Sequence, residues 1–240
     1  MYITIDQGNS RVKYMAWAED RPVAWSRGER VKAGAVVALA DGARIDGIIL
    51  CSVTDIDPMT IEELSRLTDR LILLSSFTPM PVEIGYSTPL TLGPDRIAAA
   101  AGAVAVVGHG GVAVVDAGTA ITVDYVDEKC VFRGGNIAPG LRMQLKSLHD
   151  LTARLPLVDV RPDAKDVPLL GTDTTSAIRS GVVGALAGHV EHVVAGLPEG
   201  TQVVITGGDA SLIADAVSLK AIVDPMLTSR GLYEILKFNL

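Results

Sequence analysis

The stretch Asp6-Gln7-Gly8-Asn9-Ser10-Arg11-Val12-Lys13 follows an apolar run at the start of the chain. The apolar run predicts a strand at residues 2–6, and the alternation of Val12, Tyr14 and Ala16 predicts a second strand after a tight turn. Gly8 allows a positive φ at this turn and lets a phosphate come close to the backbone amides. An ordinary hairpin explains the same residues, because Gly-Asn also favours turns.

The polar side chains of this turn suit a phosphate ligand. Asp6 ends a strand, where its carboxylate can hold Mg²⁺ directly or through water. Asn9 and Ser10 offer neutral donors, and Lys13 can point an ammonium at a terminal phosphate. The turn alone therefore supports only phosphate contact.

A second copy of the pattern lies 110 positions later, at Asp116-Ala117-Gly118-Thr119. It follows an apolar strand at 111–116, and Asp124 ends the next strand. Similarity at about half the chain length suggests duplication of a domain. We expect an N-terminal domain at 1–110 and a C-terminal domain at 111–240, with the two turns gripping one nucleotide from both sides.

The segment Gly93-Pro94-Asp95-Arg96 precedes an alanine-rich helix and allows two interpretations. Asp95 could cap the N-terminus of that helix, where a carboxylate meets free amides and the helix dipole. Asp95 could instead accept a proton from a substrate hydroxyl that attacks the γ-phosphate of ATP, with Arg96 binding an acidic or carbonyl group. Spacing does not choose between them.

The rest of the chain alternates apolar strands with helices, which predicts an α/β layer structure. The turn at Thr206-Gly207-Gly208-Asp209 could allow close approach to an adenosine. Trp17 and Trp25 are expected to pack in the first sheet, and Lys165 and Asp166 to lie in a solvated loop. Further strands are expected at 22–26, 47–53, 71–74, 130–133 and 203–206, and helices at 32–40, from 58, from 95, from 139, at 174–195 and from 227.

Composition excludes several classes of function. The chain of 240 residues carries a net charge of −7, which argues against binding to nucleic acid or to an anionic membrane. Its two cysteines lie far apart, so we expect reduced thiols and a cytoplasmic protein rather than disulfides or a zinc site. The uncharged run at 97–115 is interrupted by glycines and predicts buried elements, not a membrane span. The N-terminus does not resemble a signal peptide.

Taken together, the motifs resemble those of the type III pantothenate kinases. The turn with Asp6, Gly8, Asn9 and Lys13 resembles the first phosphate motif of that family, and Gly93-x-Asp95-Arg96 its substrate motif. The run from Asp116 to Asp124 resembles the second phosphate motif. The segments 134–140, 151–156 and 171–174 also match, in order across nearly the whole chain.

The resemblance implies two similar ribonuclease-H-like (actin-like ATPase) domains with an interdomain cleft, and phosphorylation of pantothenate by ATP with Mg²⁺, the first step toward coenzyme A. It implies Asp95 as proton acceptor, Asp116 as ligand of a monovalent cation (K⁺ or NH₄⁺), and a homodimer. The implied ATP-binding residues are Asp6, Gln7, Gly8, Asn9, Ser10, Arg11, Val12, Lys13 and Thr119, and the implied pantothenate-binding residues are Tyr86, Gly93, Pro94, Asp95, Arg96 and Thr174.

Two other functions remain open from the sequence. A noncatalytic relative would bind nucleotide or pantothenate and regulate a partner, but such relatives tend to lose the acid or the lysine that Asp95 and Lys13 supply here. A kinase of the same superfamily could also act on a different small alcohol. Two departures from the family pattern are Ser10 in place of the usual Thr, which keeps the hydroxyl, and Thr88 where Asn is often found.

Overall fold

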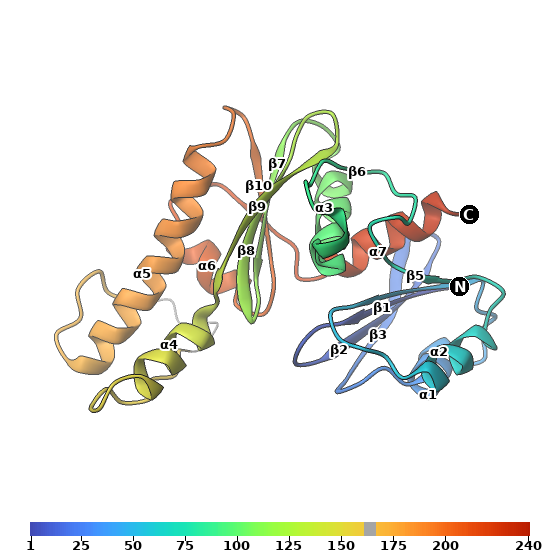
Figure 1. Cartoon of the computed structure of the whole chain (residues 1–240), viewed down its shortest axis with the longest axis horizontal. Helices are drawn as coiled ribbons and strands as arrows, with labels where there is room; N and C mark the ends of the chain where they lie inside the picture. Colours follow the sequence, from blue (N-terminus) through green and yellow to red (C-terminus); the bar gives the residue numbers. More distant parts are fainter. Residues whose placement is uncertain (161–166) are drawn as a thin grey trace. The chain divides into compact units, whose positions relative to one another are not determined.

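The computed structural model describes residues 1–160 and 167–240. The chain forms two compact units. The first comprises Met1–Gly108, Cys130–Phe132 and Met226–Leu240, and the second comprises His109–Lys129 and Arg133–Pro225. Strands and helices alternate in both (Figure 1), which confirms the predicted α/β class. The residues expected in a solvated loop, Lys165 and Asp166, lie outside the described part of the chain.

The first unit is built on a five-stranded mixed sheet in the order β3-β2-β1-β4-β5. The first three strands form an antiparallel meander, whereas β4 pairs in parallel with β1 and β5 in parallel with β4. The run Ile48-Ile49-Leu50 makes β4 suitable for burial on both faces. The strands are β1 Tyr2–Gln7, β2 Val12–Ala18, β3 Arg21–Gly28, β4 Gly47–Ser52 and β5 Leu71–Leu73.

Helices cover both faces of this sheet. The alternation of side chains along β1 sends Ile3 and Ile5 into the core with α1 and α2. It sends Thr4 to the opposite face, where the Thr4 hydroxyl accepts a hydrogen bond from Nε1 of Trp17 at 3.1 Å. On that face α7 packs against β1, β2 and β4, and α3 packs along α7. The helices are α1 Ala33–Ala40, α2 Pro58–Ser65, α3 Pro94–Val107 and α7 Leu227–Phe238.

The C-terminal helix α7 packs within the first unit, although it ends the half of the sequence expected to form the second domain. The ring of Tyr233 stacks on that of Trp17, with centroids 4.6 Å apart and planes 3° apart. The Tyr233 hydroxyl also donates a hydrogen bond to Asp20 at 3.0 Å. An apolar helix face does not indicate from sequence which sheet it will cover. The division of domains at residue 110 stays a prediction.

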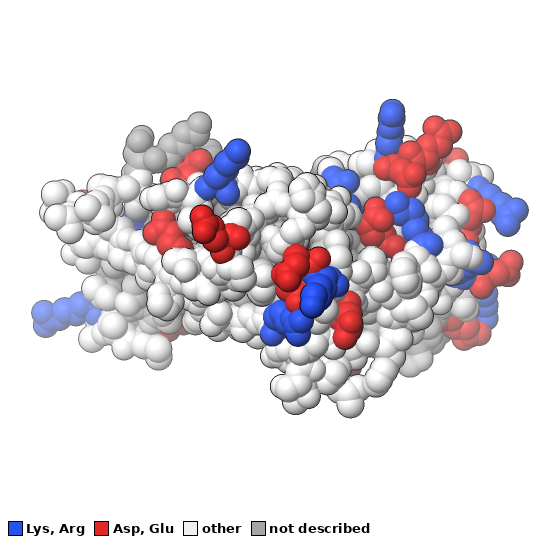
Figure 2. All heavy atoms as spheres, turned by 90° about the horizontal axis from the view of Figure 1, so that it is seen from above, with Lys and Arg blue, Asp and Glu red and all other residues white. Residues whose placement is uncertain are grey.

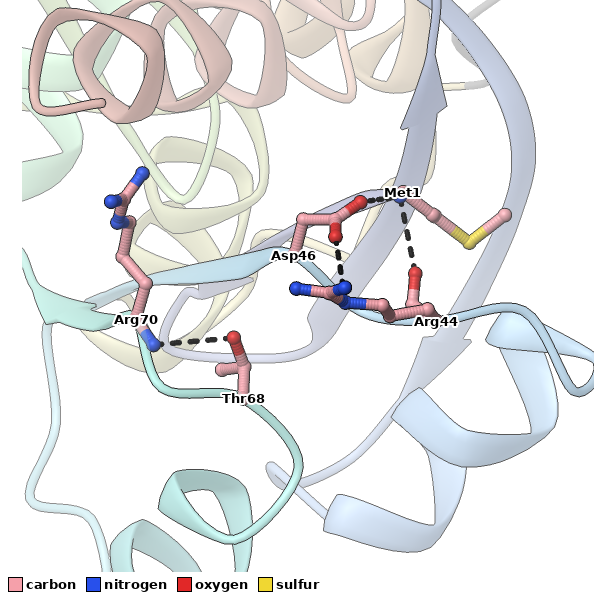
Figure 3. Close-up of polar contacts among 5 residues, drawn as sticks. All are labelled: Met1, Arg44, Asp46, Thr68 and Arg70. Carbon is pink, nitrogen blue, oxygen red and sulfur yellow. Dashed lines mark hydrogen bonds and ion pairs between the residues drawn. The ribbon is translucent and has the colours of Figure 1, made fainter.

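Polar contacts hold the edge of the sheet where β1 and β4 begin (Figure 3). The ammonium of Met1 pairs with the carboxylate of Asp46 and donates a hydrogen bond to the carbonyl of Arg44 at 3.1 Å. Asp46 in turn pairs with Arg44, and its amide donates to the carbonyl of Met1 at 2.8 Å. The hydrogen bond from the ammonium lowers the pKa of the Asp46 carboxyl. These contacts fix the register that brings Asp6 opposite Cys51 at the far end of the two strands.

The second unit also has a mixed sheet, in which β11, β10, β7, β8 and β9 are neighbours in that order. β7 and β8 are antiparallel, whereas β10 is parallel to both β7 and β11. The apolar sides of α4, α5 and α6 meet the sheet in one core. The elements are β7 Val112–Ala117, β8 Ala120–Val126, β9 Val131–Pro139, α4 Leu141–Asp150, α5 Thr174–Ala195, β10 Gln202–Thr206, α6 Ala210–Ala216 and β11 Ile222–Val223.

Strand β9 corrects two expectations. It runs to Pro139, well past the predicted end at residue 133, and the next helix begins at Leu141 instead of Pro139. The strand continues through Gly135 because this residue lies directly against Val123 and Asp124, so close that a Cβ would collide with both. The glycine at position 135 therefore permits close strand packing.

Within the loop at 75–94 the structure adds two short elements, β6 Glu83–Ile84 and the 3₁₀ turn η1 Pro89–Thr91. β6 pairs in parallel with Val131 and Phe132, the start of β9 that belongs to the first unit. Two residues are too short a run for a strand to be recognised from its pattern.

The two tryptophans differ in their environment. Trp17 is buried, as expected, but Trp25 is 64% exposed, so the prediction that it packs in the sheet is wrong. Trp25 lies on the edge strand β3, and the guanidinium of Arg27 lies 5.0 Å from the centre of its ring. The sequence predicted a strand at 22–26 but not that one face of this strand would be uncovered.

On the face drawn in Figure 2, acidic and basic side chains lie together in small groups, and much of that face carries neither. Among the described residues, no helix is both long enough and apolar enough to cross a membrane.

Candidate functional site

The turn between β1 and β2 places Asp6 opposite Lys13. The two are direct partners in the antiparallel register, and the turn closes with a hydrogen bond from the amide of Gly8 to the carbonyl of Arg11 at 3.0 Å. Gly8 does not adopt the positive φ expected for it. Asn9, Ser10 and Arg11 are exposed at the tip of the turn. Their side chains and the backbone around Gly8 remain open to a ligand.

Two residues of the predicted phosphate segment have structural roles. Val12 is fully buried in the core beneath α1 and α2. The Gln7 side chain accepts a hydrogen bond from the amide of Val31 at 3.2 Å and donates one to the carbonyl of Gly8 at 2.9 Å. The Gln7 side chain therefore stabilises the turn. The side chains of Gln7 and Val12 are both taken up by contacts within the protein.

Asp6 is a buried carboxyl whose pKa is raised from 3.8 to about 6. Burial is the largest cause, Lys13 lowers the pKa, and the negative charge of Asp95 raises it. Cys51, which stands opposite Asp6 on β4, lies near the same charged groups. Burial raises the pKa of the Cys51 thiol, and the charges of Asp6 and Asp95 raise it further. The first unit thus brings Asp95 near Asp6, at the turn between β1 and β2 that the sequence predicts to bind phosphate.

Asp95 occupies the first turn of α3 but is not its N-cap, which is Gly93. The Asp95 carboxylate accepts a hydrogen bond from the amide of Arg96 at 2.9 Å. Gly93 lies so close that a Cβ on it would be 2.5 Å from Oδ1 of Asp95. The simple capping interpretation is therefore wrong in position, although a carboxylate in the first turn still interacts favourably with the helix dipole.

An open groove of about 630 Å³ lies beside this helix start. One wall is the segment after β4, and the other is η1 with the residues that lead into α3. Gly93 and Pro94 of the predicted substrate motif are part of this wall. The lining residues are Ser52, Val53, Thr54, Asp55, Leu90, Thr91, Leu92, Gly93 and Pro94.

Arg96 and Tyr86, both predicted to bind substrate, lie together. Arg96 is only 7% exposed, and its Cζ lies 5.7 Å from the centre of the Tyr86 ring. A third residue, Phe132, completes the group at 5.6 Å from the same Cζ. Sequence reasoning missed Phe132, because only the pairing of β9 with the two-residue strand β6 brings it here.

In the second unit, Asp116 is the penultimate residue of β7 and stands opposite Thr122, and the turn closes with a hydrogen bond from the amide of Gly118 to the carbonyl of Ala120 at 3.1 Å. Gly207 adopts a φ of +100° and packs against Ala117 and Asp116. The glycine turn after β10 thus approaches the second phosphate turn closely.

Asp209, the last residue of the segment predicted to approach an adenosine, is a buried carboxyl. Its amide donates to the carbonyl of Ala117 at 3.0 Å. Burial raises its pKa, while Arg142 lowers it and Asp159 raises it.

Thr119 and Thr174 are both exposed in the second unit. The amide of Gly140 donates a hydrogen bond to the carbonyl of Thr119 at 3.1 Å, which links the second phosphate turn to the start of α4. Thr174 is the first residue of α5, after the N-cap Asp173, whose carboxylate accepts a hydrogen bond from the amide of Ser176.

Comparison with known proteins identifies the family. A family model described as type III pantothenate kinase matches residues 2–196. A type III pantothenate kinase of Phocaeicola vulgatus is 35% identical, over 100% of this chain and 99% of the relative. One of Porphyromonas gingivalis is 34% identical, over 99% and 98% of the two chains.

Solved structures show the fold. A proposed Baf family transcriptional activator of Campylobacter jejuni has a TM-score of 0.64 at 24% identity, covering 99% of this chain and 98% of its own. A ROK family glucokinase of Streptomyces griseus, in complex with glucose and AMPPNP, has a TM-score of 0.54 at 13% identity, covering 98% of each chain. The likeness confirms the predicted ribonuclease-H-like, actin-like kinase fold. With the family match over most of its length, the chain belongs to the type III pantothenate kinases.

Proposed function

We propose that the chain carries out the reaction of its family, ATP-dependent phosphorylation of pantothenate to 4'-phosphopantothenate, with Asp95 as the proton acceptor. The observation that carries this assignment is the position of Asp95, close enough to the phosphate turn to raise the pKa of Asp6. A residue that accepts a proton from the attacking hydroxyl must lie beside the γ-phosphate, and the interaction of Asp95 with Asp6 supports that position for Asp95 if the turn between β1 and β2 holds the phosphates.

The phosphate turn would hold the ATP phosphates. Lys13 supplies positive charge opposite Asp6, and the exposed tip at Asn9, Ser10 and Arg11 supplies side-chain donors and backbone amides. Two neighbouring carboxylates with one lysine leave excess negative charge, which fits a divalent cation at Asp6. Mg²⁺ bound there would neutralise charge on the β- and γ-phosphates.

Pantothenate would enter along the groove at the start of α3. Its hydroxyl oxygen attacks the γ-phosphorus while the bond from that phosphorus to the β,γ-bridging oxygen breaks and ADP leaves. Asp95 takes the hydroxyl proton. Gly93 and Pro94 line the groove, and Arg96 with Tyr86 would hold the carboxylate or amide groups of pantothenate.

Asp116 would hold a monovalent cation, K⁺ or NH₄⁺. The support from the structure is that glycines flank its carboxylate. A Cβ on Gly118 would lie 3.2 Å from Oδ1 of Asp116, and one on Gly207 would lie 2.5 Å from the same atom. Side chains at either position would crowd the carboxylate, and their absence fits a bound ion.

Three further assignments rest on the family resemblance: Thr119 would contact ATP, Thr174 would contact pantothenate, and the active form would be a homodimer. A cytoplasmic location would be in keeping with the two free cysteines, Cys51 and Cys130.

A coupled assay of ADP release tests the proposed function. The purified chain is incubated with ATP and Mg²⁺, with and without pantothenate, first in K⁺ and then in Na⁺. We expect ADP release that needs both pantothenate and K⁺. No pantothenate-dependent release in either salt would contradict the proposal and favour a noncatalytic regulator. Release with another small alcohol but not with pantothenate would point to a different acceptor.

A further inference from the structure

Arg96 is held against two aromatic rings. Its Cζ lies 5.7 Å from the ring centre of Tyr86 and 5.6 Å from that of Phe132. The two rings meet edge to face, with centroids 6.0 Å apart and planes at 68°. A guanidinium at this distance is attracted by the negative face of an aromatic ring, more strongly where water is excluded.

The backbone fixes the two rings relative to each other. In the pairing of β6 with β9, Ile84 stands opposite Phe132, and the amide of Gly85 donates to the carbonyl of Phe132 at 3.0 Å. One end of this short ladder is closed by the hydrogen bond from the amide of Glu83 to the carbonyl of Cys130 at 2.9 Å. Tyr86 follows Gly85 directly in the chain. The orientation of Phe132, which is fully buried, is therefore set by the strand and not by the groove.

A fixed guanidinium matters for binding. Arginine has a long side chain whose ordering costs conformational entropy. An arginine that is already ordered before the ligand arrives avoids part of that cost, and the ligand binds more tightly. Arg96 follows Asp95 directly on α3, so its orientation also bears on where a ligand lies relative to the proton acceptor.

We propose that Phe132 is a positioning residue for pantothenate: it fixes the guanidinium of Arg96, together with Tyr86, in the orientation that receives the charged or polar part of the substrate. The inference rests on the proposed function, in which Arg96 binds pantothenate. Phe132 would act only through Arg96 and would not touch the substrate.

The test compares Phe132→Leu, which keeps a large apolar side chain but removes the ring, with Ile48→Val. Ile48 is a fully buried residue of β4 in the core beneath α1 and α2, and serves as the control for a small loss of packing. We expect the KM for pantothenate to rise roughly tenfold in Phe132→Leu, while the KM for ATP changes less than about twofold. Ile48→Val should leave both KM values unchanged at a similar loss of thermal stability. Equal rises in both KM values, or no rise beyond the control, would overturn the inference.

A second measurement does not depend on activity. The side-chain Nε–Hε signal of Arg96, assigned by its loss in Arg96→Lys, senses the ring currents of its neighbours in the NMR spectrum of the free protein. We expect it to move toward the value of an exposed arginine in Phe132→Leu and to stay in place in Ile48→Val. An unmoved signal would show that Phe132 does not fix Arg96. If the unaltered protein released no ADP with pantothenate, the proposed function would fail, and this signal alone would decide the role of Phe132.

Discussion

The carboxyl groups of Asp6 and Asp95 interact, although Asp6 is the penultimate residue of strand β1 and Asp95 lies in the first turn of helix α3. The charge of Asp95 helps to raise the pKa of Asp6 to about 6, and both carboxylates raise the pKa of Cys51. In the proposed reaction, Asp6 serves the phosphate donor and Asp95 the acceptor. The proposed donor-side and acceptor-side carboxylates of the phosphoryl transfer therefore lie in the same unit.

The variant Asp95→Asn should lose turnover by a factor of about 10²–10⁴, because an amide cannot take the hydroxyl proton. ATP affinity, measured by calorimetry, should change little, since Lys13 and the turn remain. Asp69→Asn, a change at an exposed acid of the same unit, is the control and should keep full turnover. An Asp95→Asn protein with unaltered turnover would remove Asp95 from the mechanism.

The stability of the first unit should depend on the protonation of Asp6. A carboxyl with a raised pKa binds its proton more tightly in the folded state than in the unfolded state. Its favourable contribution is complete below the unfolded value of 3.8 and is lost as the pH rises to about 6. Asp6→Asn, which mimics the protonated form, should therefore gain stability relative to the unaltered protein by about 2–3 kcal/mol between pH 4 and pH 7.5.

Urea unfolding at the two pH values measures this difference for the first unit, with Asp69→Asn as the control. If the difference in unfolding free energy between Asp6→Asn and the unaltered protein were the same at pH 4 and pH 7.5, the pKa of Asp6 would not be raised by folding.

Local patterns predicted most of the elements around the site. Apolar runs and turn residues place β1, β4, β7 and β10, and the start of α3 falls one residue from its predicted position. These features depend on neighbours in the chain, which the sequence displays. The motif from Gly93 to Arg96 was likewise recognisable because its residues are contiguous.

Features that depend on distant contacts were not predictable. Phe132 reaches Arg96 only because β6 pairs with β9, and α7 joins the first unit only through the fit of its surface to β1, β2 and β4. The strand around Gly135 was predicted to end at residue 133, because the sequence does not show that Asp124 packs against this glycine. In each case the deciding partner lies far away along the chain.

The crossing of α3 and α7 should depend on Gly102. A Cβ on Gly102 would collide with the carbonyl of Leu227, and the nearest atoms are backbone atoms that cannot rotate away. Gly102→Ala should therefore destabilise the first unit by about 1–3 kcal/mol. Gly34→Ala, in α1, meets no atom within 4 Å and should be neutral or stabilising by up to about 1 kcal/mol. Thermal unfolding compares the two; equal effects would mean that the helices do not touch at Gly102.

The response to K⁺ should depend on Gly207. This residue has a φ of +100° and lies against Asp116, so Gly207→Ala should both strain the backbone and push the Asp116 carboxylate out of place. We expect the K⁺ concentration for half-maximal ADP release to rise by about tenfold or more, as for the loss of about 1.4 kcal/mol of cation binding.

Gly200→Ala is the matched control for that change. Gly200 also has a positive φ, +82°, but a Cβ there meets nothing within 4 Å. Gly200→Ala should show a similar strain cost of about 1–2 kcal/mol in thermal unfolding and an unchanged K⁺ response. The two variants thus separate backbone strain from displacement of Asp116. If both shifted the K⁺ response equally, strain alone would account for the effect, and Asp116 would lose its support as the cation ligand.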